Sequence, residues 1–296
     1  MKKFVKSEAK SNGISFKMKS KELKKFFVRR IAALSDLHVM SRYAIFPPEW
    51  TTSQGNVLTP NAGQRQIYES YQNFCNVCDE WEIDTVLLGG DLVHGQNPIE
   101  RGIGLMSTDL GEQVAVTKEV LRPLLKGRKS HWVSGSGYHN SARGMSIEET
   151  ICEEMKNKDG IDAHWYGSIA NLKVSPFEKI INLSHGGGRA SYYRETLIAR
   201  EIIFGKVAYA NQKLPKIDIY VHGHFHWWNH LHQQGVHHIQ TPAWTAYEPI
   251  ALFTPSYPRL QPETGGVLLL FDDEGRVTVW PFLYPTPHIS DSVRMI

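Results

Sequence analysis

Aspartate and histidine residues occur in five short segments of this chain, and each segment follows a stretch typical of a β-strand. The residues are Asp36, His38, Asp91, His139, His185, His224 and His226. Carboxylates and imidazoles together suit divalent transition metals, and one carboxylate can bridge two cations through its two oxygens. Two such cations, held roughly 3.5–4 Å apart, can generate a hydroxide and stabilise an in-line displacement at phosphorus. The pattern therefore predicts a two-metal site that hydrolyses phosphate esters.

The apolar runs before these segments predict the strands that position them. These strands lie at residues 31–35, 85–88, 131–133, 180–184 and 217–221. Apolar residues at helical spacing, or a capping pair such as Ser146 and Glu149, predict helices at 64–81, 109–125, 146–155 and 192–211. Further short strands at 236–240, 266–271 and 276–282 favour a more antiparallel second half. Because neighbouring parallel strands end at one edge of a sheet, we expect the ligands to converge there.

Length and composition favour one large domain. The chain has 296 residues, of which 41% are hydrophobic and 21% charged, enough to bury a substantial core. Its three cysteines argue against a disulfide framework, and it has no apolar run of membrane-spanning length. Cys75 and Cys78 lie on the apolar stripe of the helix at 64–81 and are predicted to be core residues. We expect a cytoplasmic protein in a reduced compartment, without a secretory signal or a membrane partner.

Positive charge is concentrated at the amino terminus. Residues 1–30 hold eleven Lys or Arg and two Glu, a net charge of +9, so the remainder carries −6 of the overall +3. We interpret residues 1–28 as a basic arm and residues 29–296 as a single domain. Basic side chains that neutralise phosphates release counterions, so the arm could attract nucleic acid. The alternative interpretation is a solubilising terminal segment.

The motifs, taken in order, resemble those of the calcineurin-like metallophosphoesterase superfamily. They are Asp36-Leu37-His38, Gly90-Asp91, a Gly and His motif at 135–139, His185 after a strand, and Gly223-His224-Phe225-His226. The resemblance extends from about residue 29 to residue 283. It implies an α/β fold, a four-layer α/β/β/α sandwich of two mixed sheets flanked by helices. Ser35-Asp36-Leu37-His38 followed by Phe46-Pro47-Pro48 also resembles uncharacterised members from phages and prophages.

The same resemblance implies which residue binds which ion. Asp36, His38 and His226 would bind one metal ion, His185 and His224 the second, and Asp91 would bridge them. Mixed carboxylate and imidazole ligands suit Mn, which we expect, or Fe, Zn, Co or Ni, whereas Ca and Mg prefer oxygen ligands alone. The expected cofactor is therefore a pair of divalent transition-metal ions.

The third motif departs from the family pattern of Gly-Asn-His followed by an acid, in which the Asn binds the second metal ion. The run here is Gly135-Ser136-Gly137-Tyr138-His139-Asn140. Either Ser136 replaces the Asn, with two residues inserted before His139, or Tyr138 occupies its position and Asn140 reaches back. We favour Ser136, because Gly135-Ser136 directly follows the third strand. His139 is the candidate general acid or phosphate donor in either case.

Several neighbouring residues are weaker candidates. His94 and Asn97 could orient His139 or a ligand, and Arg189 and Arg194 could bind phosphate beside the glycines at 186–188. We expect surface or supporting roles, and not a third metal site, for His222, His230, His232, His237 and His238. Core packing, in preference to base stacking, is expected for Trp227, Trp228 and Trp244.

The predicted function is metal-dependent hydrolysis of phosphate esters. The basic arm and the tryptophans favour a phosphodiesterase or nuclease acting on nucleotides or nucleic acid over a phosphomonoesterase or a protein phosphatase. The altered third motif instead favours a function of a different class. In that case the protein would bind nucleic acid without catalysis and its metal centre would be degenerate. The retention of the other metal ligands favours the enzyme. The sequence leaves the native metal and the oligomeric state open.

Overall fold

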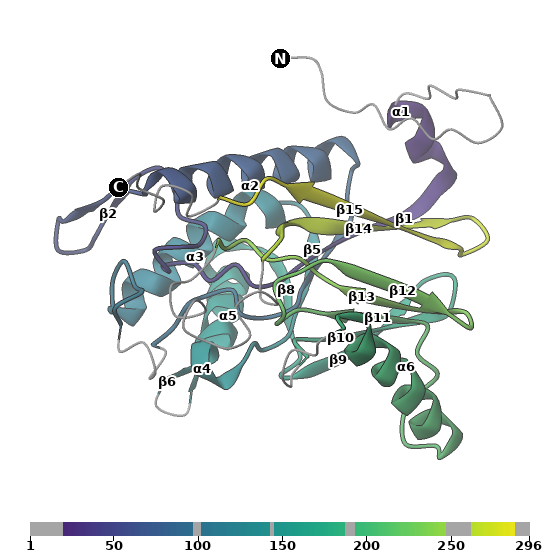
Figure 1. Cartoon of the computed structure of the whole chain (residues 1–296). Coiled ribbons are helices and arrows are strands. Elements are labelled where there is room, and N and C mark those ends of the chain that lie inside the picture. Colours follow the sequence, from purple (N-terminus) through teal and green to yellow (C-terminus); the bar gives the residue numbers. More distant parts are fainter. Residues whose placement is uncertain (1–19, 97–101, 143–144, 187–192, 247–261, 288–296) are drawn as a thin grey trace, which may run out of the picture.

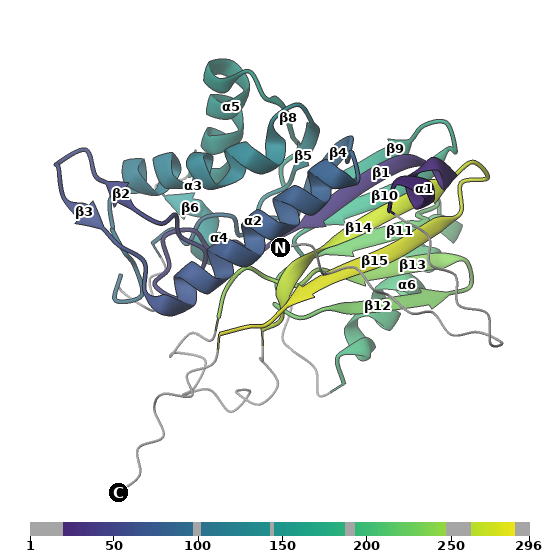
Figure 2. The ribbon, with the colours of Figure 1, turned by 90° about the horizontal axis from the view of Figure 1, so that it is seen from above.

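Two β-sheets lie face to face between layers of helices, as Figures 1 and 2 show from two sides. This computed structural model describes residues 20–96, 102–142, 145–186, 193–246 and 262–287. The arrangement confirms the predicted α/β fold, a four-layer α/β/β/α sandwich of two mixed sheets flanked by helices. Among the described residues, no helix combines the length and the apolar character needed to cross a membrane.

The first sheet has the strand order β15-β14-β1-β4-β5-β8. Its strands are β1 (Phe27–Leu34), β4 (Thr85–Leu88), β5 (Lys129–Trp132), β8 (Asp162–Trp165), β14 (Thr264–Asp272) and β15 (Val277–Tyr284). Strands β1, β4, β5 and β8 run parallel, whereas β14 and β15 pair antiparallel at one side. Leu34 pairs with Leu88, so β1 and β4 end side by side and release their loops at the same edge.

The second sheet has the order β12-β13-β11-β10-β9. Its strands are β9 (Ile169–Val174), β10 (Lys179–Ser184), β11 (Ile219–His222), β12 (Asn229–Gln233) and β13 (Val236–Gln240). Strands β10, β11 and β13 run parallel, and β9 and β12 pair antiparallel at the two edges. The antiparallel pairing expected in the second half of the chain is thus found at the sheet edges, while the strands that carry ligands are parallel.

Four long helices cover the outer faces of the sheets. They are α2 (Ala62–Glu80), α3 (Leu110–Leu125), α5 (Ile147–Asp159) and α6 (Glu195–Ala210). Side chains alternate between the two faces of a strand, so Ala32 and Leu34 of β1 pack with α2, α3 and α5, whereas Ile31 and Ala33 pack with the second sheet. Ile202 of α6 packs with Tyr220 on the far face of the second sheet. The helices predicted from periodicity are therefore confirmed.

Capping side chains explain where three of these helices begin. The Asn61 side chain accepts a hydrogen bond from Gln64 N, and the Gln64 side chain accepts one from Asn61 N, which completes a capping box for α2. The Asp109 side chain accepts a hydrogen bond from Glu112 N at the start of α3, and Ser146 Oγ accepts one from Glu149 N at the start of α5. Ser146 is therefore the N-cap of α5, as the sequence predicts.

The remaining elements are short. They are α1 (Ser20–Leu23), η1 (Lys24–Phe26), β2 (Trp50–Thr51), β3 (Val57–Leu58), α4 (Gly137–Asn140), β6 (Ser141–Ala142) and β7 (Met145–Ser146). The first strand begins at Phe27, inside the range interpreted as the arm, and Lys24 donates a hydrogen bond to Glu82 at 2.6 Å. Residues 20–28 therefore contact the folded domain, while residues 1–19 lie outside the described part of the chain.

Cys75 and Cys78 lie on the buried face of α2, as their place on the apolar stripe predicts. Both are free thiols. Burial raises the pKa of the Cys75 thiol to about 12, which keeps it protonated near neutral pH and unsuited to metal binding.

Candidate metal centre

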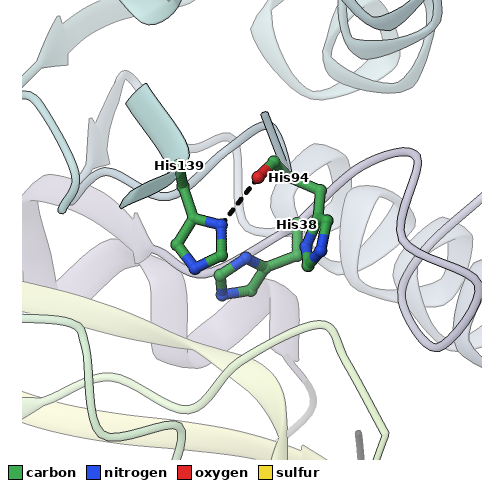
Figure 3. A group of neighbouring side chains, drawn as sticks. All are labelled: His38, His94 and His139. Carbon is green, nitrogen blue, oxygen red and sulfur yellow. Dashed lines mark hydrogen bonds between the residues drawn. The ribbon is translucent and has the colours of Figure 1, made fainter. Parts of the chain in front are cut away.

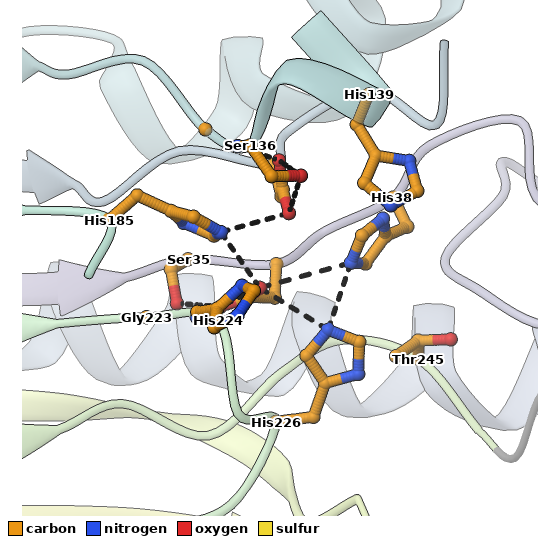
Figure 4. A network of polar contacts seen from close by, with 12 residues as sticks. Ser35, His38, Ser136, His139, His185, Gly223, His224, His226 and Thr245 are labelled. Carbon is orange, nitrogen blue, oxygen red and sulfur yellow. Dashed lines mark hydrogen bonds and ion pairs between the residues drawn. The ribbon is translucent and has the colours of Figure 1, made fainter. Parts of the chain in front are cut away.

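The predicted ligands meet where the two sheets end. Asp36 and His38 follow β1, Asp91 follows β4, and His185 follows β10. Figure 4 shows the imidazoles of the loops after β1, β10 and β11 pointing toward one another around a common centre. The loop after β4 is hydrogen-bonded to the loop after β1. Asp36 N donates to Gly90 O and His38 N donates to Asp91 O, each with a donor–acceptor distance of 2.9 Å. Residues distant in the sequence are thus held in one crevice.

The backbone of these loops is strained at the ligands themselves. Positive φ angles occur at Asp36 (54°), His38 (42°), Asp91 (51°), His224 (82°) and His226 (61°). Residues other than glycine seldom adopt this region, which typically costs about 1–3 kcal/mol for each residue and persists where the surroundings impose it. Positive φ angles also occur at Met40, Glu82, Glu178, Gln212 and Gln234, so at the candidate ligands they describe how the loops after the strands turn these side chains toward one another.

The first group of candidate ligands is Asp36, His38 and His226. Their ligand atoms all lie within 4.8 Å of one another. Asp36 Oδ1 lies 3.3 Å from His226 Nε2 and 3.8 Å from His38 Nε2, and the two imidazole nitrogens are 3.0 Å apart. Carboxylate and imidazole donors therefore point at one small volume, as the binding of a divalent cation requires.

The second group is Asp91, His185 and His224, again with ligand atoms within 4.8 Å of one another. His185 Nε2 lies 2.9 Å from Asp91 Oδ2. On its other side, His185 Nδ1 donates to Gly89 O at 2.8 Å. A carbonyl partner of this kind orients the ring and directs the second ring nitrogen toward the metal position.

The two groups are close enough to act as one site. His185 Nε2 of the second group lies 4.0 Å from Asp36 Oδ1 of the first. The backbone N–H of His224 donates to both oxygens of the Asp36 carboxylate, at 3.1 Å and 2.9 Å. Ser35 donates a further hydrogen bond to Asp36 and lies 2.6 Å from the Thr241 hydroxyl. The Asp36 carboxylate is therefore fixed from several directions.

Two glycines make this approach sterically feasible. A Cβ at Gly223 would lie 2.5 Å from Ser35 Oγ and 2.6 Å from Asp36 Oδ2. A Cβ at Gly135 would overlap Asp91 Oδ1. Any larger residue at either position would displace a candidate metal ligand, so glycine is required there for packing and not for a turn.

The electrostatics of the centre favour ionised carboxylates beside a neutral imidazole. Burial acts to raise the pKa of Asp91, but the charges of His185, His139 and His38 hold it well below its usual value. Asp36 is shifted in the same direction, because His185 and His226 outweigh its burial. Burial lowers the pKa of His38 well below its usual value, with the charge of His139 adding to the effect. Metal binding requires anionic carboxylates and neutral imidazoles. His38 is already neutral, whereas the charges of Asp91 and Asp36 outweigh burial and raise the pKa of His185 to about 10, so a metal ion would have to displace a proton from His185.

The donor set therefore fits two divalent cations. Each group combines one carboxylate with two imidazoles, a mixture that suits Mn, Fe, Co, Ni or Zn better than Ca or Mg. The Asp91 and Asp36 carboxylates, with pKa values held low, would offset the positive charge of the ions.

A third group, His38, His94 and His139, lies beside the first and is drawn in Figure 3. His139 Nδ1 donates to the carbonyl oxygen of His94 at 2.7 Å, which fixes the orientation of the ring. The ring centroids of His139 and His38 are 4.6 Å apart. The prediction that His94 orients His139 agrees with this geometry, although the contact is made by the backbone of His94 and not by its imidazole.

Ser136 is hydrogen-bonded to the Asp91 carboxylate. Its N–H donates to Asp91 Oδ1 at 2.7 Å, and its hydroxyl lies 3.2 Å and 3.1 Å from the two carboxylate oxygens. This placement agrees with the interpretation in which Ser136 occupies the position of the family Asn. The side chain of Asn140, and the whole of Asn97 and Arg189, fall outside the described residues.

Arg194 lies at the margin of the centre. Its guanidinium lies 4.8 Å from the centroid of the Trp227 ring, and Nη1 is 3.5 Å from Glu263 Oε2. Glu263 in turn donates its N–H to the carbonyl oxygen of His226 at 2.7 Å. Arg194 is therefore linked through Glu263 to the backbone of the loop that carries His226, but these contacts do not include the side chain of a candidate ligand.

The other histidines of the second half extend along the second sheet. His238 Nε2 lies 3.1 Å from His222 Nδ1, and His230 Nε2 lies 3.0 Å from His237 Nδ1. The rings of His232 and His237 stack with centroids 3.9 Å apart. Within the described ranges, the three groups placed to hold a metal include none of them. A supporting role, as expected from the sequence, fits this placement.

Acidification is expected to destabilise the fold through His238. Burial lowers the pKa of His238 from 6.5 to about 4, although its hydrogen bond to Ile198 O opposes the shift. The unfolded chain then binds a proton that the folded chain lacks, so stability present above pH 6.5 is lost as the pH falls toward 4. The slope is on the order of 1 kcal/mol per pH unit. Thermal unfolding across this range measures the slope, and a His238→Gln variant that retained it unchanged would refute the assignment.

The tryptophans pack as core residues. Trp244 is buried, and its ring lies 5.1 Å from Tyr71 and 5.8 Å from Phe74, measured between centroids. Trp227 is also buried and stacks on Phe225 at 5.1 Å. These contacts agree with the expected packing role.

Glu148 is a residue of the centre that the sequence did not single out. It is fully buried in the first turn of α5 and accepts hydrogen bonds from the backbone N–H groups of Leu92 and Gly135, both at 2.7 Å. Burial raises its pKa to about 7, with the charge of Asp91 adding to the effect and the two N–H groups opposing it. In the sequence it resembles any acidic residue near a helix start.

Comparison with known proteins identifies distant structural likenesses. Neither the protein-family models nor the curated proteins include a match to this chain. Wild-type Vps29 from Entamoeba histolytica, complexed with Zn²⁺, is 17% identical with a TM-score of 0.42, covering 86% of this chain and 98% of that chain. An archaeal phosphodiesterase is 10% identical with a TM-score of 0.44, covering 86% and 99%. A predicted phosphoesterase from Streptococcus pneumoniae is 12% identical with a TM-score of 0.34, covering 86% and 98%.

Proposed function

We propose that this protein is a metal-dependent phosphoesterase of the calcineurin-like type that uses two divalent cations. The observation that carries the proposal is the pair of adjacent groups, Asp36 with His38 and His226, and Asp91 with His185 and His224. Asp91 is proposed to bridge the ions, and Mn is the proposed native metal. When bound, such ions lower the pKa of water for attack and stabilise the charge that develops on phosphate oxygens.

The residues of the chain would divide the remaining work. The imidazoles and carboxylates of the two groups hold the ions and exclude bulk water, since Asp36, Asp91 and His185 are buried. His139, held by the carbonyl oxygen of His94, is the proposed general acid that donates a proton from Nε2 to the leaving oxygen. Arg194, which is linked through Glu263 to the loop that carries His226, is proposed to attract the substrate phosphate, in competition with its Glu263 contact.

Phosphodiesters, as nucleotides or nucleic acid, are the proposed substrates. The support is the net charge of +9 within residues 1–30, which favours a polyanionic partner. Lys24, Arg29 and Arg30 form ion pairs with Glu82 or Asp84 of the domain, so the six lysines of residues 1–19 carry most of this support. Phosphomonoesters and phosphoproteins are the competing substrates, and neither accounts for a basic arm of this size.

Hydrolysis assays with purified protein test the proposal. The metal-free protein is loaded separately with Mn, Fe, Zn, Co or Ni and assayed on an aryl phosphodiester and the matched aryl phosphomonoester. We expect metal-dependent release of the aryl alcohol that a chelator abolishes, with the diester preferred. Tight binding of two metal equivalents without hydrolysis of either ester would instead indicate a non-catalytic binding protein.

Removing residues 1–19 tests whether the basic arm recruits nucleic acid. The deletion removes six of the eleven basic residues and leaves the described fold intact. Fewer phosphate contacts should weaken DNA or RNA binding and flatten its salt dependence, yet leave hydrolysis of a small aryl phosphodiester unchanged. Fluorescence anisotropy over a range of salt concentrations measures this. Equal affinity and equal salt slope in both proteins would show that the arm is only a solubilising segment.

A further inference from the structure

Glu148 connects two loops that carry candidate site residues. Its Oε1 accepts from Leu92 N, directly after Asp91, and its Oε2 accepts from Gly135 N, directly before Ser136. Ser136 in turn donates two hydrogen bonds to the Asp91 carboxylate. One buried side chain thus joins the loop after β4 to the loop after β5, beneath the proposed bridging ligand.

These bonds require two acceptor atoms that carry no hydrogen of their own. Each of the two backbone N–H groups needs its own acceptor, and only a carboxylate supplies two acceptor oxygens in one planar group. A glutamine of equal size would supply one oxygen and one NH₂, which would face an N–H and leave a buried donor unsatisfied. Glutamate is therefore the residue type that satisfies both loops.

Helix capping does not account for Glu148. Ser146 supplies the cap of α5 by accepting from Glu149 N, and the Glu149 side chain is exposed. The Glu148 side chain instead points inward, away from solvent, to the backbone of the two loops. The helix amino terminus still favours its negative charge, which offsets part of the desolvation penalty of burying the carboxylate.

The close approach of the loops leaves little tolerance for movement. A Cβ at Gly90 would overlap the backbone of Gly135, and a Cβ at Gly135 would overlap Asp91. A shift of either loop would therefore move the Asp91 carboxylate, which is the proposed bridge between the ions. Some groups hydrogen-bond to metal ligands without binding the metal themselves. Replacing such a group typically lowers metal affinity or activity about 10–100-fold.

We propose that Glu148 is the positioning residue of the metal centre, holding Asp91 and Ser136 in the geometry that binds both ions. This inference rests on the proposed function insofar as it assumes that Asp91 binds metal. It predicts that an uncharged residue of the same size weakens metal binding without unfolding the protein.

The test compares Glu148→Gln with Glu149→Gln in the full-length chain. The comparison is made at pH 8, because the pKa of Glu148 is raised to about 7. At that pH both substitutions remove one negative charge from the first turn of α5, but only the first breaks a hydrogen bond to a loop. Titration of the metal-free proteins with Mn²⁺ by calorimetry should show affinity weakened about 10–100-fold in Glu148→Gln and unchanged in Glu149→Gln. Half-maximal activation of hydrolysis should need correspondingly more Mn²⁺, while saturating Mn²⁺ recovers much of the turnover.

Other outcomes separate this inference from the proposed function. Wild-type Mn²⁺ affinity in a folded Glu148→Gln protein would overturn the positioning role, even if thermal unfolding showed lower stability. If Glu148→Gln does not fold, Glu148→Asp, which keeps both oxygens on a shorter side chain, should show the same weakening, and unchanged affinity there would also overturn it. Weakened metal binding in a protein that hydrolyses no phosphate ester would support the positioning role and refute the enzyme. A wild-type protein that binds no divalent cation would refute both.

Discussion

Replacing Asp91 by Asn should abolish hydrolysis and lower the metal content of the purified protein. An amide offers one oxygen and no negative charge, whereas the bridging role needs two oxygens and an ionised group. Asp91 is buried, and the neighbouring His185, His139 and His38 hold its pKa well below its usual value, so it is an anion at neutral pH. Removing a single stabilising group from an active site typically lowers turnover by roughly 10²–10³, and a group shared by both ions should reach at least the upper value.

Elemental analysis together with steady-state kinetics on an aryl phosphodiester measures both effects. Asp273→Asn is the matched control, because it removes one carboxylate from an exposed turn far along the chain and should change neither quantity. An Asp91→Asn protein that retained two metal equivalents and near wild-type turnover would show that Asp91 is not the bridge.

Replacing His139 by Ala should lower turnover by roughly 10²–10⁴ while leaving the metal content unchanged, the usual effect of losing a positioned acid or base. The reason lies in its contacts. His139 Nδ1 is bonded to His94 O, and the ring lies against His38 without joining the two groups of proposed ligands. The loss should be smaller for an ester whose leaving group needs no proton, so a comparison of aryl and alkyl phosphodiesters measures proton donation specifically.

His164→Ala serves as the control for His139, since His164 is a half-buried imidazole on β8 that contacts Asp162 and His131 and none of the candidate ligands. It should change neither turnover nor metal content. If His139→Ala lost metal in proportion to activity, His139 would be a metal ligand. The third group, His38, His94 and His139, would then be a metal-binding site.

The four long helices could be predicted because local patterns specify them. Apolar periodicity identified α2, α3 and α6 to within a few residues, and the Ser146–Glu149 pair located the start of α5. The central strands were equally clear, since they are buried on both faces and form apolar runs.

Three edge strands, β8, β9 and β12, were not predicted, whereas the edge strand β15 was. Strands β8 and β12 are short and rich in His, Asn and Asp, so they lack an apolar run. Strand β8 pairs with β5 across α5, whereas β9 and β12 form antiparallel pairs with the next strands along the chain, β10 and β13. Their conformation depends on these partners more than on local propensity.

The candidate ligands were predictable because each follows a strand end, and parallel strands bring such ends together. The supporting residues were not. Glu148 reaches the centre from a helix, and Thr241 contacts Ser35 from beyond β13, so neither belongs to a local motif. The hydrogen bonds between Ser136 and Asp91 became evident only in the structure.

A crystal structure of the protein loaded with Mn²⁺, with anomalous data collected at the manganese edge, tests the central claim most directly. Our account predicts two anomalous peaks roughly 3.5–4 Å apart. One should lie among Asp36, His38 and His226, the other among His185 and His224, with an Asp91 oxygen within bonding distance of each. A single peak, or peaks coordinated by other residues, would contradict the two-metal centre.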